Sequence, residues 1–234
     1  MVKKNKDILV TEAYRVLMSN IEYSSYDKPI KVIVVTSSQP GEGKTTIAKN
    51  LALAMAESGK KVVLVDCDMR RPSIHKKFKI SNSTGLSEIL TGQYNKIKDN
   101  YNINENIDII TSGRTPPNPV EMISSKKMDD FIELLRESYD YVIMDAPPLM
   151  AVADAQILAV KADGVVFVVR ESKSKKTFAN EAKNILEKKK CNILGVVFNS
   201  VTENTNAYYG DDKYLEKRNH HGMRRDMPEK LSIN

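Results

Sequence analysis

The clearest chemical signature in the chain is a glycine-rich loop that follows an apolar run and opens a helical pattern. It reads Thr36-Ser-Ser-Gln-Pro-Gly-Glu-Gly-Lys-Thr-Thr46. Such a loop turns successive backbone N–H groups toward one anion, and the helix N-terminus adds a favourable potential for phosphates. In this pattern Lys44 reaches the β- and γ-phosphates and the Thr45 hydroxyl is a ligand of Mg²⁺. The loop predicts a site for ATP and Mg²⁺ formed by Pro40, Gly41, Glu42, Gly43, Lys44, Thr45 and Thr46.

One position departs from the usual phosphate-loop pattern. The motif G-x-x-x-x-G-K-[ST] has glycine where this chain has Ser38, so only Gly41 and Gly43 remain. A glycine-rich turn before an ordinary helix is the alternative interpretation. The placement of Gly-Lys-Thr-Thr directly after an apolar run favours the nucleotide site.

Three carboxylates stand at the ends of apolar runs, where ligands bind in parallel α/β sheets. Asp66 and Asp68 end one run, and Asp145 ends another. Asp145 is typical of the carboxylate that holds Mg²⁺ directly or through water, and we expect Asp68 to help place the metal. A hydroxyl nucleophile must also be oriented and relieved of its proton. Asp66 is the first candidate for this base and Asp68 the second; Asp68 could instead cap a helix or pair with Arg70.

Among the remaining candidates, the two arginines and Asn199 have more than one interpretation. Arg70 and Arg71 follow the acids directly and could compensate the phosphates, hold an acidic peptide or be surface charges. Asn199 ends the last apolar run and could face the adenine or cap a turn. Cys67 is expected to pack as a small buried residue.

The elements that must position these residues alternate between strand and helix. Six apolar runs with little polar alternation predict strands buried on both faces, at 31–36, 61–66, 107–111, 141–145, 164–169 and 192–199. Amphipathic patterns predict helices at 8–23, 45–58, 125–138 and 175–189, with a short one at 85–92. The order predicts an α/β fold with a doubly wound, mostly parallel sheet of the P-loop NTPase type.

Length and composition fit one such domain. The chain has 234 residues, of which 41% are hydrophobic and 28% charged. It has no run of 18 apolar residues and no signal-peptide pattern, so we expect a cytoplasmic location. The apolar pattern stops after Val201, which predicts a domain at 1–201 and a flexible polar tail at 202–234. The net charge of +6 is spread among acids and identifies no partner.

Taken together, the motifs resemble those of the bacterial tyrosine kinases of capsule and exopolysaccharide synthesis. The matching segments are 37–46, Val65-Asp-Cys-Asp-Met-Arg-Arg-Pro72 and Asp145-Ala-Pro-Pro148, which are the Walker A, A′ and B motifs of that family. The segments 113–119 and Val152-Ala-Asp-Ala-Gln156 are also similar to family segments.

The resemblance implies an ATP-dependent protein-tyrosine kinase that phosphorylates tyrosines in its own C-terminal tail. Tyr208, Tyr209 and Tyr214 are then the acceptors, with Asp211 and Asp212 beside them. The resemblance also implies a membrane-anchored activator with a cytoplasmic tail, ring-type self-association with phosphorylation between subunits, an opposing tyrosine phosphatase and recruitment to the inner face of the cell membrane. No nucleic acid is expected as a partner.

Two further observations bear on this resemblance. The N-terminal segment that supports subunit contacts in the family, Glu-x-x-Arg-x-x-Arg, matches at Glu12 and Arg15 but has Met18 in the last place. The alternative function is a non-kinase ATPase switch similar to the septum- and chromosome-positioning ATPases. Those proteins usually carry an extra lysine early in the loop, where this chain has Ser37, Ser38 and Gln39, and this difference favours the kinase.

Overall fold

The computed structural model describes residues 2–24, 29–93, 101–171 and 173–201. Residues 1–200 form one compact unit and residues 201–234 form a second, of which only Val201 is described. The expected acceptor tyrosines Tyr208, Tyr209 and Tyr214 therefore lie outside the described residues.

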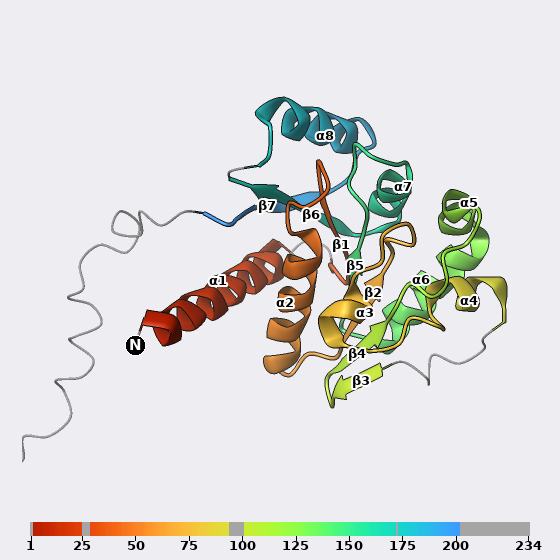
Figure 1. Cartoon of the computed structure of the whole chain (residues 1–234), viewed down its shortest axis with the longest axis horizontal. Coiled ribbons are helices and arrows are strands. Elements are labelled where there is room, and N and C mark those ends of the chain that lie inside the picture. Colours follow the sequence, from red (N-terminus) through yellow and green to blue (C-terminus); the bar gives the residue numbers. More distant parts are fainter. Residues whose placement is uncertain (1, 25–28, 94–100, 172, 202–234) are drawn as a thin grey trace, which may run out of the picture. The chain divides into compact units, whose positions relative to one another are not determined.

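The centre of the first unit is one seven-stranded sheet with the order β3-β4-β2-β5-β1-β6-β7 (Figure 1). Its strands are β1 (Val32–Ser37), β2 (Val62–Asp66), β3 (Tyr101–Asn104), β4 (Ile107–Ile110), β5 (Tyr141–Asp145), β6 (Gly164–Arg170) and β7 (Ile193–Asn199). All neighbouring pairs are parallel except β3 with β4, which is antiparallel. The six predicted strands and the mostly parallel sheet are confirmed, whereas β3 was not predicted.

Helices cover both faces of the sheet. One face packs against α1 (Val2–Ser24), α2 (Lys44–Glu57) and α3 (Ile74–Phe78) through a core that includes Ile33 and Val35 of β1. The other face packs through Val32 and Val34 against the remaining helices. These are α4 (Leu86–Thr91), α5 (Pro119–Ser124), α6 (Lys126–Ser138), α7 (Asp154–Lys161) and α8 (Lys176–Lys188). Every residue of β1 is buried, as expected for a central parallel strand that alternates its side chains between two cores.

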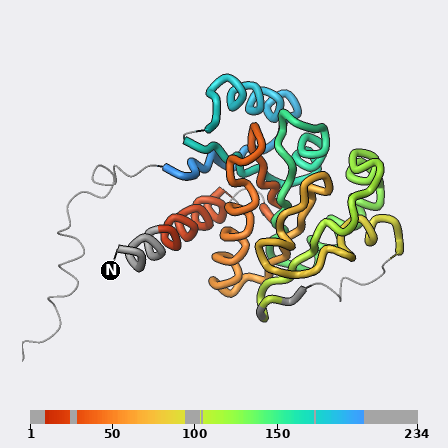
Figure 2. Tube along the Cα trace, viewed as in Figure 1, coloured from red at the N-terminus to blue at the C-terminus, as the bar shows by residue number. Residues whose placement is uncertain are grey.

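The first helix packs beside α2, as the tube in Figure 2 also shows. Ile21 of α1 is buried, and the Tyr14 hydroxyl accepts a hydrogen bond of 3.1 Å from Nδ2 of Asn50 in α2. Met18 is half-buried against the same core, while Glu12 and Arg15 form an exposed ion pair of 3.4 Å. Two of the three positions of the N-terminal segment are thus at the surface, and the third packs inward.

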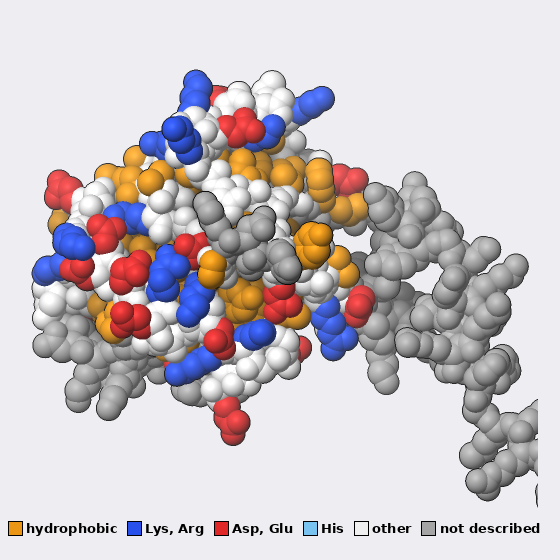
Figure 3. Space-filling view, turned by 180° about the vertical axis from the view of Figure 1, so that it is seen from behind, with side chains coloured by type: hydrophobic (Ala, Val, Ile, Leu, Met, Phe, Trp, Pro, Cys, Tyr) orange, Lys and Arg blue, Asp and Glu red, His pale blue; other side chains and the backbone are white. Residues whose placement is uncertain are grey.

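The outer surface carries both acidic and basic side chains, as expected for a solvated exterior. On the face opposite to that in Figure 1, acidic and basic side chains lie close together (Figure 3). None of the helices in the described part of the chain combines the length and the apolar character that crossing a bilayer requires.

Candidate active site

The glycine-rich loop turns sharply between β1 and α2. Gly41 and Gly43 have φ of 81° and 99°, a backbone region that other residues enter only with strain. The Gly43 carbonyl then accepts from the N–H groups of Thr46 and Ile47, each at 3.0 Å, and so begins α2. A Cβ atom on Gly43 would lie 1.9 Å from Nδ2 of Asn199, so the second glycine is required by packing as well as by its backbone angles.

The Glu42 side chain is buried, does not line the cavity and holds the loop through hydrogen bonds. Its completely buried carboxylate accepts from the Ser38 hydroxyl at 2.9 Å, from the Gln39 N–H at 2.9 Å and from the Ser174 hydroxyl. Ser38 therefore has a defined role where the usual motif has glycine: its hydroxyl binds the carboxylate four residues later. The prediction that Glu42 contributes to nucleotide binding can then concern only its backbone.

The last residue of β6 and the loop that follows it support the glycine-rich loop from a second side. Arg170 Nη1 donates to the Gly41 carbonyl at 3.2 Å, and a Cβ atom on Gly41 would lie 2.3 Å from Nζ of Lys173. Asn199 at the end of β7 donates to the Glu42 carbonyl at 2.9 Å. The structure thus places Asn199 directly against the loop, where its amide fixes the backbone.

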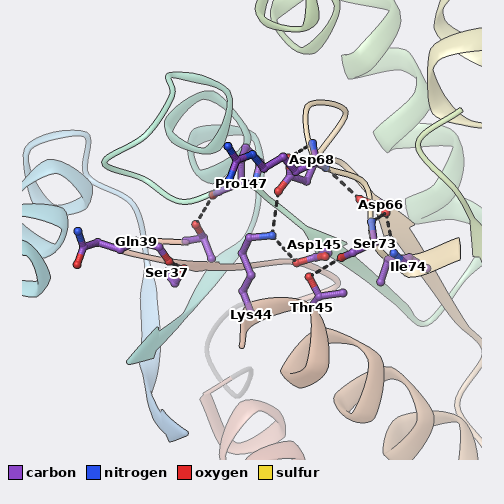
Figure 4. A network of polar contacts seen from close by, with 12 residues as sticks. Ser37, Gln39, Lys44, Thr45, Asp66, Asp68, Ser73, Ile74, Asp145 and Pro147 are labelled. Carbon is purple, nitrogen blue, oxygen red and sulfur yellow. Dashed lines mark hydrogen bonds and ion pairs between the residues drawn. The ribbon is translucent and has the colours of Figure 1, made fainter. Parts of the chain in front are cut away.

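Lys44 lies at the centre of the converging acids (Figure 4). Its Nζ is 3.0 Å from Asp68 Oδ2 and 3.6 Å from Asp145 Oδ1, and its side chain is only 10% exposed. Burial opposes the charge on Lys44, but the carboxylates of Asp145 and Asp68 outweigh it and raise the pKa of the amine. Lys44 is therefore a fixed positive charge beside the loop.

Asp66 and Asp145 are direct neighbours on adjacent strands, since the register of β2 and β5 pairs them. Both carboxyl groups are completely buried. Burial and the charge of Asp145 raise the pKa of Asp66 to about 7, although backbone N–H groups and Lys44 counteract them. Burial likewise raises the pKa of Asp145 against the opposing effects of Lys44 and Thr45. Two acids that share one buried site do not ionise together easily.

The two candidate bases differ in their surroundings. Asp66 Oδ2 accepts from the N–H groups of Ser73 at 3.0 Å and Ile74 at 2.9 Å, and its Oδ1 accepts from Asp68 N at 3.2 Å. These bonds occupy about three of the four lone-pair positions of a carboxylate. Asp68 lines the cavity. Its Oδ1 accepts from the Arg71 N–H at 3.0 Å, while its Oδ2 pairs with Lys44. Asp68 thus both closes a turn and pairs with Lys44.

The residues expected to hold Mg²⁺ suit that ion. Thr45 and Asp68 line the cavity, and the oxygens of Asp145 are buried without a hydrogen bond of ordinary geometry to any described residue. In the part of the chain that is described, no three His, Cys, Asp or Glu side chains form a ready-made cage. Mg²⁺ usually binds with ATP through one or two carboxylates and the phosphates rather than in an all-protein cage, so this arrangement fits.

The structure separates the two arginines. Arg70 Nε donates to Asp154 Oδ2 at 2.8 Å, and the Asp154 side chain is only 2% exposed, so this arginine ties the loop after β2 to the start of α7. Arg71 has no such partner among the described residues and lines the cavity. Cys67 between the acids is 1% exposed, which confirms that it packs as a small buried residue.

A cavity of about 620 Å³ lies at the carboxyl ends of the strands and collects these groups. It is lined by Pro40, Gly41, Gly43, Lys44, Thr45, Thr46, Asp68, Arg70, Arg71, Ser73, Lys77, Pro147, Pro148, Ala151 and Val152.

The sequence reasoning missed Ser73, whose hydroxyl donates to Thr45 Oγ1 at 3.0 Å, and Ser174 on the other side of the loop. It also missed Asp154, although the segment 152–156 carried a family signal.

Comparison with known proteins places this site in a family. Residues 30–194 match the model of an AAA domain. The chain is 41% identical over 214 residues to the tyrosine-protein kinase YwqD of Bacillus subtilis, covering 89% of this chain and 90% of the relative. It is 39% identical over 199 residues to the tyrosine-protein kinase CpsD of Streptococcus pneumoniae, covering 84% and 87%.

Solved structures agree with the sequence relatives. The chimerical protein CapA2B2 has a TM-score of 0.78 at 38% identity, covering 82% of this chain and 85% of that one. The kinase domain of the Escherichia coli tyrosine kinase ETK has a TM-score of 0.76 at 30% identity, covering 82% and 78%. The septum site-determining protein MinD of Pyrococcus horikoshii is more distant, with a TM-score of 0.61 at 25% identity over 72% and 69%. The fold, the buried carboxylates around Lys44 and these relatives together show that the chain belongs to the family of bacterial tyrosine-protein kinases.

Proposed function

We propose that this chain transfers the γ-phosphoryl group of ATP to tyrosine and thereby regulates the synthesis and export of a capsule or exopolysaccharide. The observation that carries the proposal is the convergence of three buried carboxylates, Asp66, Asp68 and Asp145, on Lys44 beside the glycine-rich loop. A simple ATPase needs one such acid for its metal. The additional acids provide a proton acceptor for an incoming hydroxyl.

In the proposed mechanism, backbone N–H groups from Gly41 to Thr46 and the amine of Lys44 bind the phosphates. Bound Mg²⁺ would neutralise developing phosphate charge, with Thr45, Asp68 and Asp145 as the residues that hold it. The tyrosine oxygen bonds to the γ-phosphorus while the bond to the β–γ bridging oxygen breaks, and ADP leaves. The phenol proton passes to Asp66, the first candidate base, or to the alternative base Asp68, which lines the cavity whereas Asp66 lies buried behind it.

The acceptors in this proposal are Tyr208, Tyr209 and Tyr214 of a neighbouring copy. We further propose a membrane-anchored activator whose cytoplasmic tail recruits the kinase to the inner face of the membrane, ring-type self-association and an opposing tyrosine phosphatase. The exposed pair of Glu12 and Arg15 on α1 supports a subunit contact at this helix. Met18 packs inward and leaves that contact without its third polar residue.

The test is incubation with γ-labelled ATP and Mg²⁺, with and without an activator tail, followed by mapping of phosphotyrosine. We expect label at the tail tyrosines, with more label when the activator tail is present. Release of phosphate to water with no phosphotyrosine on any protein would support the non-kinase ATPase switch instead.

A further inference from the structure

One segment at the cavity breaks the mixed-charge pattern of the chain. Residues 69–87 contain no acidic residue, and their basic residues are Arg70, Arg71, Lys76, Lys77 and Lys79. This segment includes the turn after β2 and the whole of α3. A concentration of one charge sign beside a cavity attracts an oppositely charged ligand.

Three of these cations, Arg70, Arg71 and Lys77, are exposed and line the cavity, but only Arg71 and Lys77 have no ion pair among the described residues. Their backbones are anchored close to the reacting groups. The Arg71 N–H donates to Asp68 Oδ1 at 3.0 Å, and Lys77 lies one helical turn beyond Ser73.

The tail sequence offers acids at a matching spacing. Asp211 and Asp212 stand between Tyr209 and Tyr214. Each of these two tyrosines therefore has both acids within three residues. In an extended peptide two or three residues span about 7–10 Å. When a tyrosine hydroxyl reaches the buried acids, the neighbouring carboxylates therefore remain at the outer part of the cavity.

We infer that Arg71 and Lys77 form a recognition site for the acidic residues beside the acceptor tyrosine, and that its occupant is the segment with Asp211 and Asp212 of a second copy of this chain. This inference rests on the proposed kinase function and adds its substrate preference. Arginine binds a carboxylate through two parallel N–H groups, while lysine acts as a point charge. The same two cations disfavour tyrosines with basic neighbours, so this site should favour Tyr209 over Tyr214, which follows Lys213 directly.

The experiment uses the full-length chain and a peptide acceptor covering residues 206–215, compared with the same peptide carrying Asp211→Asn and Asp212→Asn. We expect wild-type kcat/KM to be about tenfold higher for the acidic peptide, as two partly exposed charge pairs would give. The preference should shrink as salt concentration rises. The enzyme variant Arg71→Glu/Lys77→Glu should lose it and should prefer a peptide with Asp211→Lys and Asp212→Lys.

Lys76→Glu is the matched control, since it makes the same charge change on α3 at an exposed position that does not line the cavity. It should keep the wild-type preference. The inference is overturned if wild type treats both peptides alike, or if the double variant changes KM for ATP as much as KM for peptide, because the cations then serve the nucleotide. If free peptides are poor acceptors, the inactive Lys44→Met chain replaces them in the assay. It is then compared with the same chain that also carries Asp211→Asn and Asp212→Asn. A wild-type enzyme that labels no tyrosine at all contradicts the proposed function itself.

Discussion

At the residue scale, the arrangement of the carboxylates defines the chemistry of the site. The strand register brings Asp66 beside Asp145, and both are shut off from water. Burial and the neighbouring charge raise the pKa of Asp66 to about 7, far above that of an ordinary aspartate. Lys44 sits between Asp68 and Asp145 and balances part of the negative charge. Asp66 and Asp145 thus form a buried acid pair, while Asp68 faces the cavity beside Lys44.

The first prediction separates the two candidate bases. Asp66→Asn should lower kcat for tyrosine phosphorylation by about 10²-fold or more, the usual effect of removing a general base, and should leave ATP affinity within a few-fold. Asp68→Asn should mainly weaken ATP binding, because Lys44 and the metal lose a partner. Steady-state kinetics together with a fluorescent-nucleotide titration measure both effects. The opposite pattern would assign the base to Asp68.

At the element scale, the glycine-rich loop depends on the loop between β6 and α8. Glu42 is buried, and Ser174 from that second loop donates to its carboxylate, while Arg170 donates to the Gly41 carbonyl. The nucleotide loop is thus shaped by residues more than a hundred positions later in the chain. A substitution in the second loop should therefore alter the binding of the ATP phosphates.

The second prediction follows from that contact. Ser174→Ala removes one donor from the buried Glu42 carboxylate and should weaken ATP binding by about three- to tenfold, a part of the free energy that a hydrogen bond to a charged group contributes. Ser174→Thr keeps the hydroxyl and should retain most of the affinity. Calorimetric titration with a non-hydrolysable ATP analogue gives the comparison. Equal affinity of Ser174→Ala and wild type would show that the second loop does not set the geometry of the first.

The third prediction concerns Asp163, which directly precedes β6 and connects it to the start of β1 and to α6. Its Oδ2 accepts from the N–H groups of Lys31 at 2.9 Å and Val32 at 2.8 Å and from Arg136 Nη1 at 2.7 Å. Burial opposes the charge, but the Arg136 hydrogen bond and the backbone donors outweigh it and lower the pKa of Asp163. Asp163→Asn should therefore lower the free energy of unfolding by about 1–2 kcal/mol at pH 7.

The pH dependence of that loss has a definite sign. Because the folded-state pKa of Asp163 is lowered, its contribution is present above the unfolded-state pKa of about 4 and disappears as pH falls below it. The difference between wild type and Asp163→Asn should shrink in acid, as measured by urea unfolding from pH 7 to pH 3. A difference that stays constant or grows toward low pH would contradict the assigned hydrogen bonds.

The elements found from the sequence are those with a strong periodic pattern. Six strands and five helices were predicted because buried parallel strands are continuous apolar runs and the longer helices show an apolar stripe. The strand β3 was missed because Tyr101–Asn104 alternates with asparagine and lies at an edge. The helices α3, α5 and α7 have five, six and eight residues, too few for a periodic signal, whereas the equally short α4 was marked by the glycines at its two ends.

The site residues likewise fall into those that the sequence predicted and those that only the structure showed. Lys44, Thr45 and the strand-end acids follow local motifs, and the structure brings them together. The supports from Asp154 and Ser174 are contacts between distant parts of the chain. The segment around Asp154 resembled a family segment, but no local pattern indicated its contact with Arg70 or that of Ser174 with Glu42. Ser38 and Glu42 stand within the motif, but their mutual hydrogen bond becomes visible only when the loop is folded.

At the scale of the whole molecule, we propose that the compact unit carries out catalysis and that the tail carries the acceptors. The fourth prediction is that a chain cut after Val201 keeps its ATP affinity, because every residue that lines the cavity lies before that point. It should lose most of its self-phosphorylation. It should still label the tail of the inactive Lys44→Met chain when the two are mixed. Unchanged self-labelling of the cut chain would exclude the tail tyrosines as the main acceptors.

The central claim is that the γ-phosphoryl group passes to tyrosine rather than to water, and one partition measurement tests it most directly. With enzyme in excess over γ-labelled ATP and with the activator tail present, the label is divided between phosphotyrosine and inorganic phosphate. We predict that most of the label is recovered as phosphotyrosine in wild type and that Lys44→Met forms none. Label recovered only as inorganic phosphate, or phosphotyrosine formed equally by Lys44→Met, would contradict the account.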